Sequence, residues 1–267
     1  WKRVVLVGFL MIRLRCMKQN SIEFVGGVYN TRNSGDLVIT KYVNKNEVYV
    51  EFVKTGYTTV ARMGNIRKGT VKDRLLPSVY KVGSCGDEIV YVNGKHTVEY
   101  ELWAGVLQRC YSEKDKEKYS AYKDCTASDN FKYLPYFKEW CNKQIGFGND
   151  GWQLDKDILV KGNKIYSEDT CCFVPREVNN LFIKRYTNRG AYPIGVSYHK
   201  SSRKFASAIS TDGLQRSLGL FNNQEEAFLV YKEAKELHIK KVADKWKDQI
   251  DPRVYEALMN YQVEITD

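Results

Sequence analysis

The stretch that decides the fold is YPIGVSYHKSSRKFASAISTDGLQRSLGLFNNQEEAFLVYKEAKE, residues 192–236. It contains three segments that favour β-strands, and Ser201-Ser202 and Asp212-Gly213 between them favour hairpin turns. Asn223 then precedes a long amphipathic segment, where an Asn side chain can cap the first turn of a helix. The stretch therefore predicts three antiparallel strands, at residues 194–199, 204–210 and 216–220, followed by one helix.

The alternation of side chains along these strands predicts two different faces. Val196, Phe205, Ile209 and Leu218 are apolar and are expected to face the helix. The outer face is then polar, and its residues are Ser197, His199, Ser210, Gln215 and Ser217. Three cations gather at the first turn, where they can reach phosphates: Lys200, Arg203 and Lys204. These eight residues are the candidate DNA-contacting set.

The same stretch resembles the DNA-binding domain of plant ethylene-response factors, which also occurs in phage and mobile-element endonucleases. The residues that carry the resemblance are Gly195-Val196, Phe205, Ile209, Leu218-Gly219, Phe221, Glu225-Glu226-Ala227 and Tyr231. The resemblance implies a sheet that lies in the major groove of double-stranded DNA. The plant domains carry Arg, Trp and Glu at several outer positions, whereas this chain has mostly Ser, Ala or Gln there. We therefore expect weak base-specific readout.

The middle of the chain resembles a phage subgroup of HNH endonucleases. The matching residues are Trp103, Arg109-Cys110-Tyr111, Tyr122-Lys123, Phe137, Trp140, Leu154-Asp155, Gly162-Asn163, Tyr166-Ser167 and Cys171. This resemblance implies two strands and a helix around one divalent metal, with a His that deprotonates water. The three His residues of the chain, at positions 96, 199 and 238, all lie outside this block. The nuclease centre is therefore expected to be degraded.

The resemblance places Asp155 at the metal-side acid, Lys156 at the general base, Thr170 at the orienting Asn and Asn179 at the final ligand. A Lys acts as a base only if burial lowers its pKa by about three units. Asp155 and Asp157 would point to one face if both lay on a strand, and two carboxylates can hold Mg²⁺. The alternative is a solvated Asp-Lys-Asp sequence at the start of a strand. The catalytic candidates are thus Asp155 and Lys156, and the metal candidates are Asp155 and Asp157.

The order of these segments predicts an α+β protein with several parts. Residues 1–20 form a basic arm, 21–76 a small SH3-like β domain, and 77–98 a linker. Residues 99–182 form the HNH-like ββα region with its helices, and 183–267 the ethylene-response-factor-like domain with C-terminal helices. Within the β domain, Asn44 to Glu47 are expected to form a hairpin turn.

Charge and cysteine content restrict the location and partners of the chain. It has 42 Lys and Arg against 32 Asp and Glu in 267 residues, a formal charge of +10. Five of the cations lie in residues 1–20, so the remaining chain is only mildly basic and permits DNA binding without requiring it. Seven Cys without a CxxC pair favour reduced thiols in the cytoplasm, that of the host cell if a phage encodes the chain. No apolar run reaches the roughly 18–20 residues of a membrane helix.

Three functional hypotheses remain open at this level. The first is a phage-type, DNA-binding protein of the HNH endonuclease family without a working nuclease centre. The second is an active, metal-dependent DNA endonuclease that uses Asp155 and Asp157. The third is a phage interaction protein that inhibits a host defence nuclease, because the 19 Tyr residues also suit a protein interface. Double-stranded DNA, a host protein and a second copy of the chain are the expected partners.

Overall fold

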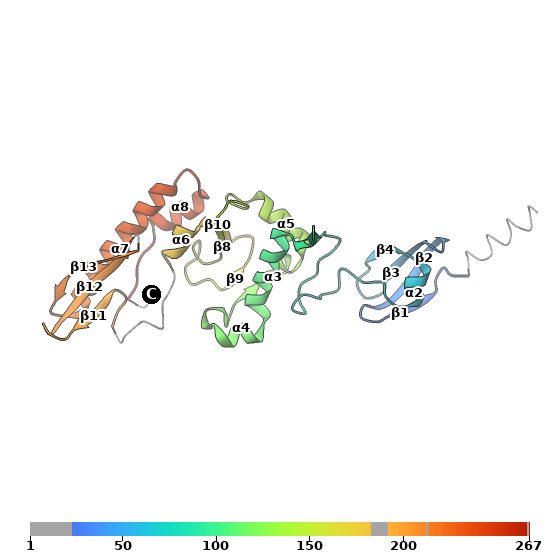
Figure 1. The fold of residues 1–267 in the computed structure, drawn as a ribbon, viewed down its shortest axis with the longest axis horizontal. Coiled ribbons are helices and arrows are strands. Elements are labelled where there is room, and N and C mark those ends of the chain that lie inside the picture. The colour runs from blue at the N-terminus through green and yellow to red at the C-terminus, as the bar shows by residue number, and fades with distance from the viewer. Residues whose placement is uncertain (1–22, 183–191, 212, 266) are drawn as a thin grey trace, which may run out of the picture. The chain divides into compact units, whose positions relative to one another are not determined.

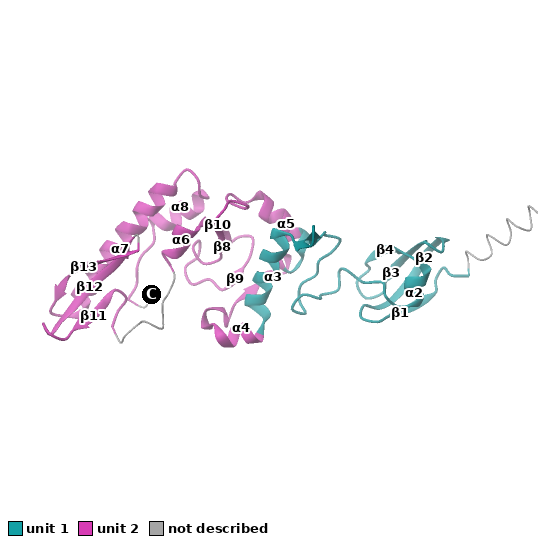
Figure 2. Cartoon of the chain, viewed as in Figure 1, with its two compact units in different colours: residues 1–112, 132–135 teal, residues 113–131, 136–267 magenta. Residues whose placement is uncertain are grey.

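The computed structural model describes residues 23–182, 192–211, 213–265 and 267. The expected basic arm, residues 1–20, lies outside the described residues. Helices and several small sheets occur together, which confirms the α+β class (Figure 1). The chain divides into two compact units (Figure 2). Unit 1 comprises residues 1–112 and 132–135, and unit 2 comprises residues 113–131 and 136–267.

Unit 1 begins with a four-stranded antiparallel sheet. Its strands are β1 (Val28–Thr31), β2 (Gly35–Asn44), β3 (Glu47–Phe52) and β4 (Thr58–Ala61), paired in sequence order. Asn44 pairs with Glu47, which confirms the predicted hairpin turn. Leu37, Ile39 and Val50 form the core together with Met63 and Ile66 of helix α2 (Met63–Arg67). Strands β1 and β4 are edges of the described sheet, so strand pairing leaves it open rather than closing an SH3-like barrel.

The second part of unit 1 is a short hairpin followed by a helix. The hairpin consists of β5 (Tyr91–Val92) and β6 (Lys95–His96), and α3 (Val98–Tyr111) follows. Thr97 caps α3, because its side chain accepts a hydrogen bond from the backbone N–H of Tyr100. Trp103, Val106, Leu107 and Cys110 recur at helical spacing, and all four are buried. The sequence assigned this helix to the HNH-like region, whereas its contacts place it in unit 1.

Short elements make up the chain that follows α3. They are α4 (Glu113–Lys118), η1 (Ser120–Tyr122), β7 (Thr126–Ala127), η2 (Asn130–Lys132), α5 (Leu134–Lys143), β8 (Trp152–Asp155), β9 (Ile165–Tyr166), β10 (Cys172–Pro175) and α6 (Arg176–Asn180). The many charges of segment 113–118 favour a loop, but the segment is the helix α4. Three consecutive apolar residues at 158–160 favour a strand, but they form none, although Ile158 is buried in the core. Strand β8 pairs antiparallel with β10, and α6 follows directly, so a ββα arrangement is present.

The C-terminal part of unit 2 confirms the prediction from residues 192–236. It contains β11 (Val196–His199), β12 (Lys204–Thr211), β13 (Leu214–Phe221), α7 (Gln224–Trp246) and α8 (Pro252–Met259). The three strands are antiparallel in the order β11-β12-β13. Asn223 caps α7 by accepting from the Glu226 N–H at 2.8 Å, and Asp251 caps α8.

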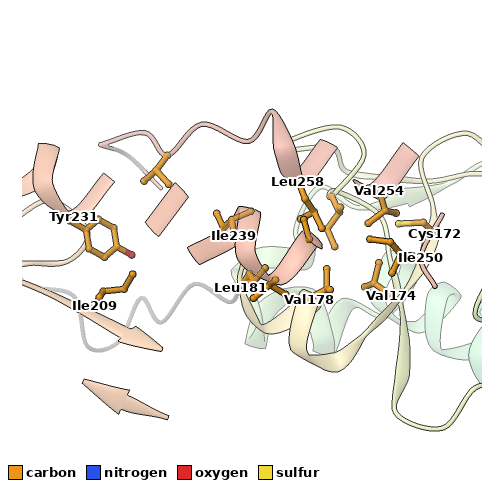
Figure 3. Packing of buried hydrophobic residues seen from close by; sticks show 14 of the residues in the cluster. Cys172, Val174, Val178, Leu181, Ile209, Tyr231, Ile239, Ile250, Val254 and Leu258 are labelled. Carbon is orange, nitrogen blue, oxygen red and sulfur yellow. The ribbon is translucent and has the colours of Figure 1, made fainter. Parts of the chain in front are cut away.

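One hydrophobic core joins the ββα elements to the C-terminal sheet and helices (Figure 3). Cys172, Val174 and Val178 come from β10 and α6, and they pack in the same cluster as Val254 and Leu258 of α8. The other end of the cluster contains Ile209 of β12 and Tyr231 of α7. The division expected at residue 183 therefore falls inside one packed unit. Within the described ranges, no helix combines the length and apolar character needed to cross a membrane.

Candidate nucleic-acid interface and nuclease-like centre

The strand register places the predicted outer residues on one face of the C-terminal sheet. Alternate residues of β12 share a face, namely Lys204, Ala206, Ala208 and Ser210. The residues paired with them on the neighbouring strands are His199, Ser197, Ser217 and Gln215, in that order. All five predicted outer side chains and Lys204 are exposed. The outer face is therefore a surface of small and polar residues.

A bulge explains how Leu218 reaches the core beside an exposed neighbour. Ser207 pairs with Gly219 and Ala208 pairs with Ser217, so Leu218 is one extra residue in β13. Its side chain packs against the core as predicted, together with Val196. Phe205 lies on the same face as Ile209 by alternation, as predicted, but it is not a member of the core cluster. Its ring lies 5.4 Å from that of Tyr198 and 5.5 Å from that of Tyr192, in an aromatic group at the end of the sheet.

The turn between β11 and β12 presents the three predicted cations to solvent. Lys200, Arg203 and Lys204 are exposed, and none has an acidic partner among the residues that the structure describes. The Nδ1 atom of His199 lies 2.8 Å from the Ser202 hydroxyl, which fixes the turn from inside. Arg203 adopts a left-handed conformation with φ of 55°. The turn therefore holds a cluster of unpaired positive charge beside the outer face.

In the nuclease-like centre, Asp155 is the last residue of β8 and lies opposite Cys172. Its Oδ1 accepts hydrogen bonds from the backbone N–H groups of Asp157 and Ile158, both at 2.8 Å. This is an Asx-type turn, in which a carboxylate organises the backbone that follows it. Because β8 ends at Asp155, Asp157 lies in the turn, and the expectation of two carboxylates on one strand face is wrong.

Burial, and then repulsion from the neighbouring Asp157 carboxylate, raises the pKa of Asp155 to about 6. Lys156 is 9% exposed, and its Nζ lies 3.2 Å from Oδ2 of Asp157. The ring centroid of Tyr166 is 5.8 Å from the same nitrogen. The alternative of a solvated Asp-Lys-Asp sequence therefore does not hold for Asp155 and Lys156, which are largely buried, whereas the Asp157 side chain is 43% exposed. An ammonium group paired with a carboxylate has no lone pair with which to accept a proton from water.

The other two predicted site residues, Thr170 and Asn179, make hydrogen bonds within the protein. The Thr170 hydroxyl donates to the Ile165 carbonyl at 2.8 Å. The Asn179 amide donates to Oε1 of Gln153 at 2.6 Å. Sequence reasoning did not assign a role to Asn163, whose Nδ2 donates to the carbonyls of Lys156 and Ile165, both at 2.7 Å. Its place in the Gly162-Asn163 turn was the signal that could have identified it.

This donor set does not fit a divalent metal. Asp155 is engaged by two backbone N–H groups, and Asp157 is engaged by the cation of Lys156. The described part of the chain contains no group of three His, Cys, Asp or Glu residues placed to hold a metal ion. A Mg²⁺ site at Asp155 and Asp157 would require Lys156 to leave first.

The thiols beside the centre do not supply a nucleophile. Cys171 and Cys172 are buried, and burial raises the pKa of Cys171 to about 12. Burial also raises the pKa of Cys172. Since the thiolate is the reactive form, these cysteines are packing residues at neutral pH.

Comparison with known proteins adds no relative: no family model, no curated protein and no solved structure matches the chain.

Proposed function

We propose that the chain is a phage-type DNA-binding protein of the HNH endonuclease kind whose nuclease-like centre is structural rather than catalytic. The observation that carries the proposal is the outer face of β11–β13. It is exposed and polar, and it borders a turn with three cations that have no acidic partner among the described residues. The opposite face packs against α7, so within the described part of the chain the outer face is the one that can receive a partner.

The chemistry of this face supports contacts to the DNA backbone more than to base edges. Lys and Arg at the turn supply charge for phosphates, and serine hydroxyls on the strands donate to phosphate oxygens at short range. The bidentate readers of guanine and adenine are Arg, Lys, Asn and Gln. On the outer face, Gln215 and Lys204 are the residues of that kind. We therefore expect binding that depends strongly on salt and weakly on sequence.

The variant Lys200→Ala/Arg203→Ala/Lys204→Ala is expected to bind random duplex DNA about tenfold or more weakly than wild type at low salt. The slope of log affinity against log salt concentration should become shallower by about 2 to 3, because each phosphate that is no longer contacted keeps its bound counterion. Fluorescence anisotropy with a labelled duplex, between about 50 and 200 mM salt, measures both quantities.

A matched control removes three other exposed cations of the same unit, Lys240, Lys241 and Lys247 on or beside α7. It changes the net charge equally and should retain most of the affinity. If both triple variants lost the same DNA affinity, the effect would be due to net charge alone. That result would contradict the assignment of DNA binding to the turn between β11 and β12. If wild type binds no DNA at low salt, the interaction-protein hypothesis takes precedence.

The nuclease-like centre is expected to show no cleavage. Phosphodiester hydrolysis needs an activated water and a metal that neutralises developing charge. Here Lys156 occupies the position of the base and is paired with Asp157. Supercoiled plasmid incubated with Mg²⁺ or Mn²⁺ should remain supercoiled. Nicking by wild type that disappears in Asp155→Asn, which keeps the acceptor oxygen of the turn, would instead establish the active-endonuclease hypothesis.

A further inference from the structure

A cavity of about 1040 Å³ lies within unit 2, between α6, the start of β11, β12, α7 and the C-terminal tail. Leu181, Ile209 and Tyr231, which are labelled in Figure 3, line part of it. The volume is slightly above the range of roughly 300–1,000 Å³ that is usual for small-molecule sites. The cavity is therefore large enough for a ligand of nucleotide size.

Lys235 brings a cation without an acidic partner among the described residues to the wall of this cavity. It lies one helical turn after Tyr231 on α7, so both side chains are on the same face of the helix. Lys235 is partly buried, and burial lowers the pKa of its ammonium group. No residue of the described ranges forms an ion pair with it. Outside those ranges, Asp212 is the one acidic residue in the sequence.

The two acidic side chains in the cavity wall, Glu177 and Asp267, already accept hydrogen bonds from other side chains. Glu177 accepts from Lys245 Nζ at 2.6 Å and from Trp246 Nε1 at 2.8 Å. Asp267 accepts from Lys161 Nζ at 2.8 Å. Since these negative charges are balanced by other donors, they do not offset Lys235. Arg176 adds a second cation to the lining. The cavity as a whole is thus suited to an anion.

We propose that this cavity binds a phosphate ester of nucleotide size, with the phosphate paired to the Lys235 ammonium group. A lysine ammonium is a compact point charge that phosphate oxygens bind well. Two tyrosines in the lining, Tyr192 and Tyr261, are partly exposed and offer ring surface to a planar base. The ester has two sources, a free nucleotide or a DNA strand on the sheet, because Ser197 and Ser210 belong to both the cavity and the outer face.

The test is titration calorimetry of the full chain with adenosine 5′-monophosphate, with adenosine and with a short DNA duplex. Lys235→Gln should weaken the binding of the nucleotide, of the duplex or of both by at least tenfold. Lys240→Gln is the control, because it removes an exposed charge from the same helix and should leave both affinities unchanged. If the nucleotide binds, adenosine should bind at least tenfold more weakly. If Lys235→Gln weakens only nucleotide binding, the ligand is a free phosphate ester. If it weakens duplex binding, the phosphate comes from the DNA backbone.

A stability measurement separates a binding lysine from a structural one. Removing a buried charge that has no partner should not destabilise the protein. Lys235→Met is therefore expected to unfold at the same temperature as wild type or higher. A clear fall in its unfolding temperature would reveal an internal partner and overturn the proposal. Equal affinities of Lys235→Gln and Lys240→Gln for both probes would also overturn it.

Discussion

Gly195→Ala is expected to destabilise unit 2 by about 3 kcal/mol or more. Gly195 has φ of +76°, and a Cβ atom there would lie 2.0 Å from Cδ2 of Tyr231. The Tyr231 ring is 6% exposed and packs in the core with Ile209, so it cannot move aside without opening that core. Urea unfolding monitored by circular dichroism and hydrogen exchange of β11–β13 would measure the loss.

Gly213→Ala is the matched control for this substitution. Its φ of +77° is nearly the same, but a Cβ atom there meets no heavy atom within 4 Å. It should cost only the left-handed strain, roughly 1 kcal/mol. The difference between the two variants therefore isolates the contact with Tyr231. Equal effects would show that the ring yields, which would contradict the rigid packing of helix α7 on the sheet.

The sequence predicted the secondary structure well at this end of the chain. Alternating strands, two turns and the Asn223 cap are local signals, and they predicted β11–β13 and α7 within a few residues. Gly195 was recognised only as part of a resemblance. The structure gives it a physical reason, because the backbone at Gly195 approaches the ring of Tyr231 too closely for any side chain.

The central region was predicted less well because its structure depends on contacts distant in sequence. Three apolar residues at 158–160 favour a strand, but Ile158 is instead buried in a core that includes residues of α8, which is distant in sequence. The burial of Lys156 against Tyr166 likewise depends on the pairing of β9 with β7, which no local pattern indicates. The sequence therefore singled out Asp155 and Asp157 as site candidates, yet could not show that Asp155 organises a turn.

The role of Asp155 in that turn gives a second large effect. Asp155→Ala removes the acceptor for two backbone N–H groups, those of Asp157 and Ile158. Asp155→Asn keeps an acceptor oxygen and, like Ala, carries no charge. The Ala variant should therefore be less stable than the Asn variant by about 2 to 5 kcal/mol, since each unpaired buried N–H costs about 1 to 3 kcal/mol. Urea unfolding of the two variants at one pH measures this difference.

The comparison of Asp155→Asn with wild type should depend on pH in a definite direction. Burial raises the pKa of Asp155 from 3.8 to about 6 in the folded protein. The stabilisation from its protonated form is complete below about pH 4 and is lost as the pH rises through about 6. The Asn variant should thus match wild type near pH 4 and exceed it near pH 7.5 by on the order of 1 to 3 kcal/mol. If Asn is instead as destabilising as Ala at pH 7.5, the carboxylate charge itself is required. That result would point to a cation held by Asp155 and would reopen the metal-dependent endonuclease hypothesis.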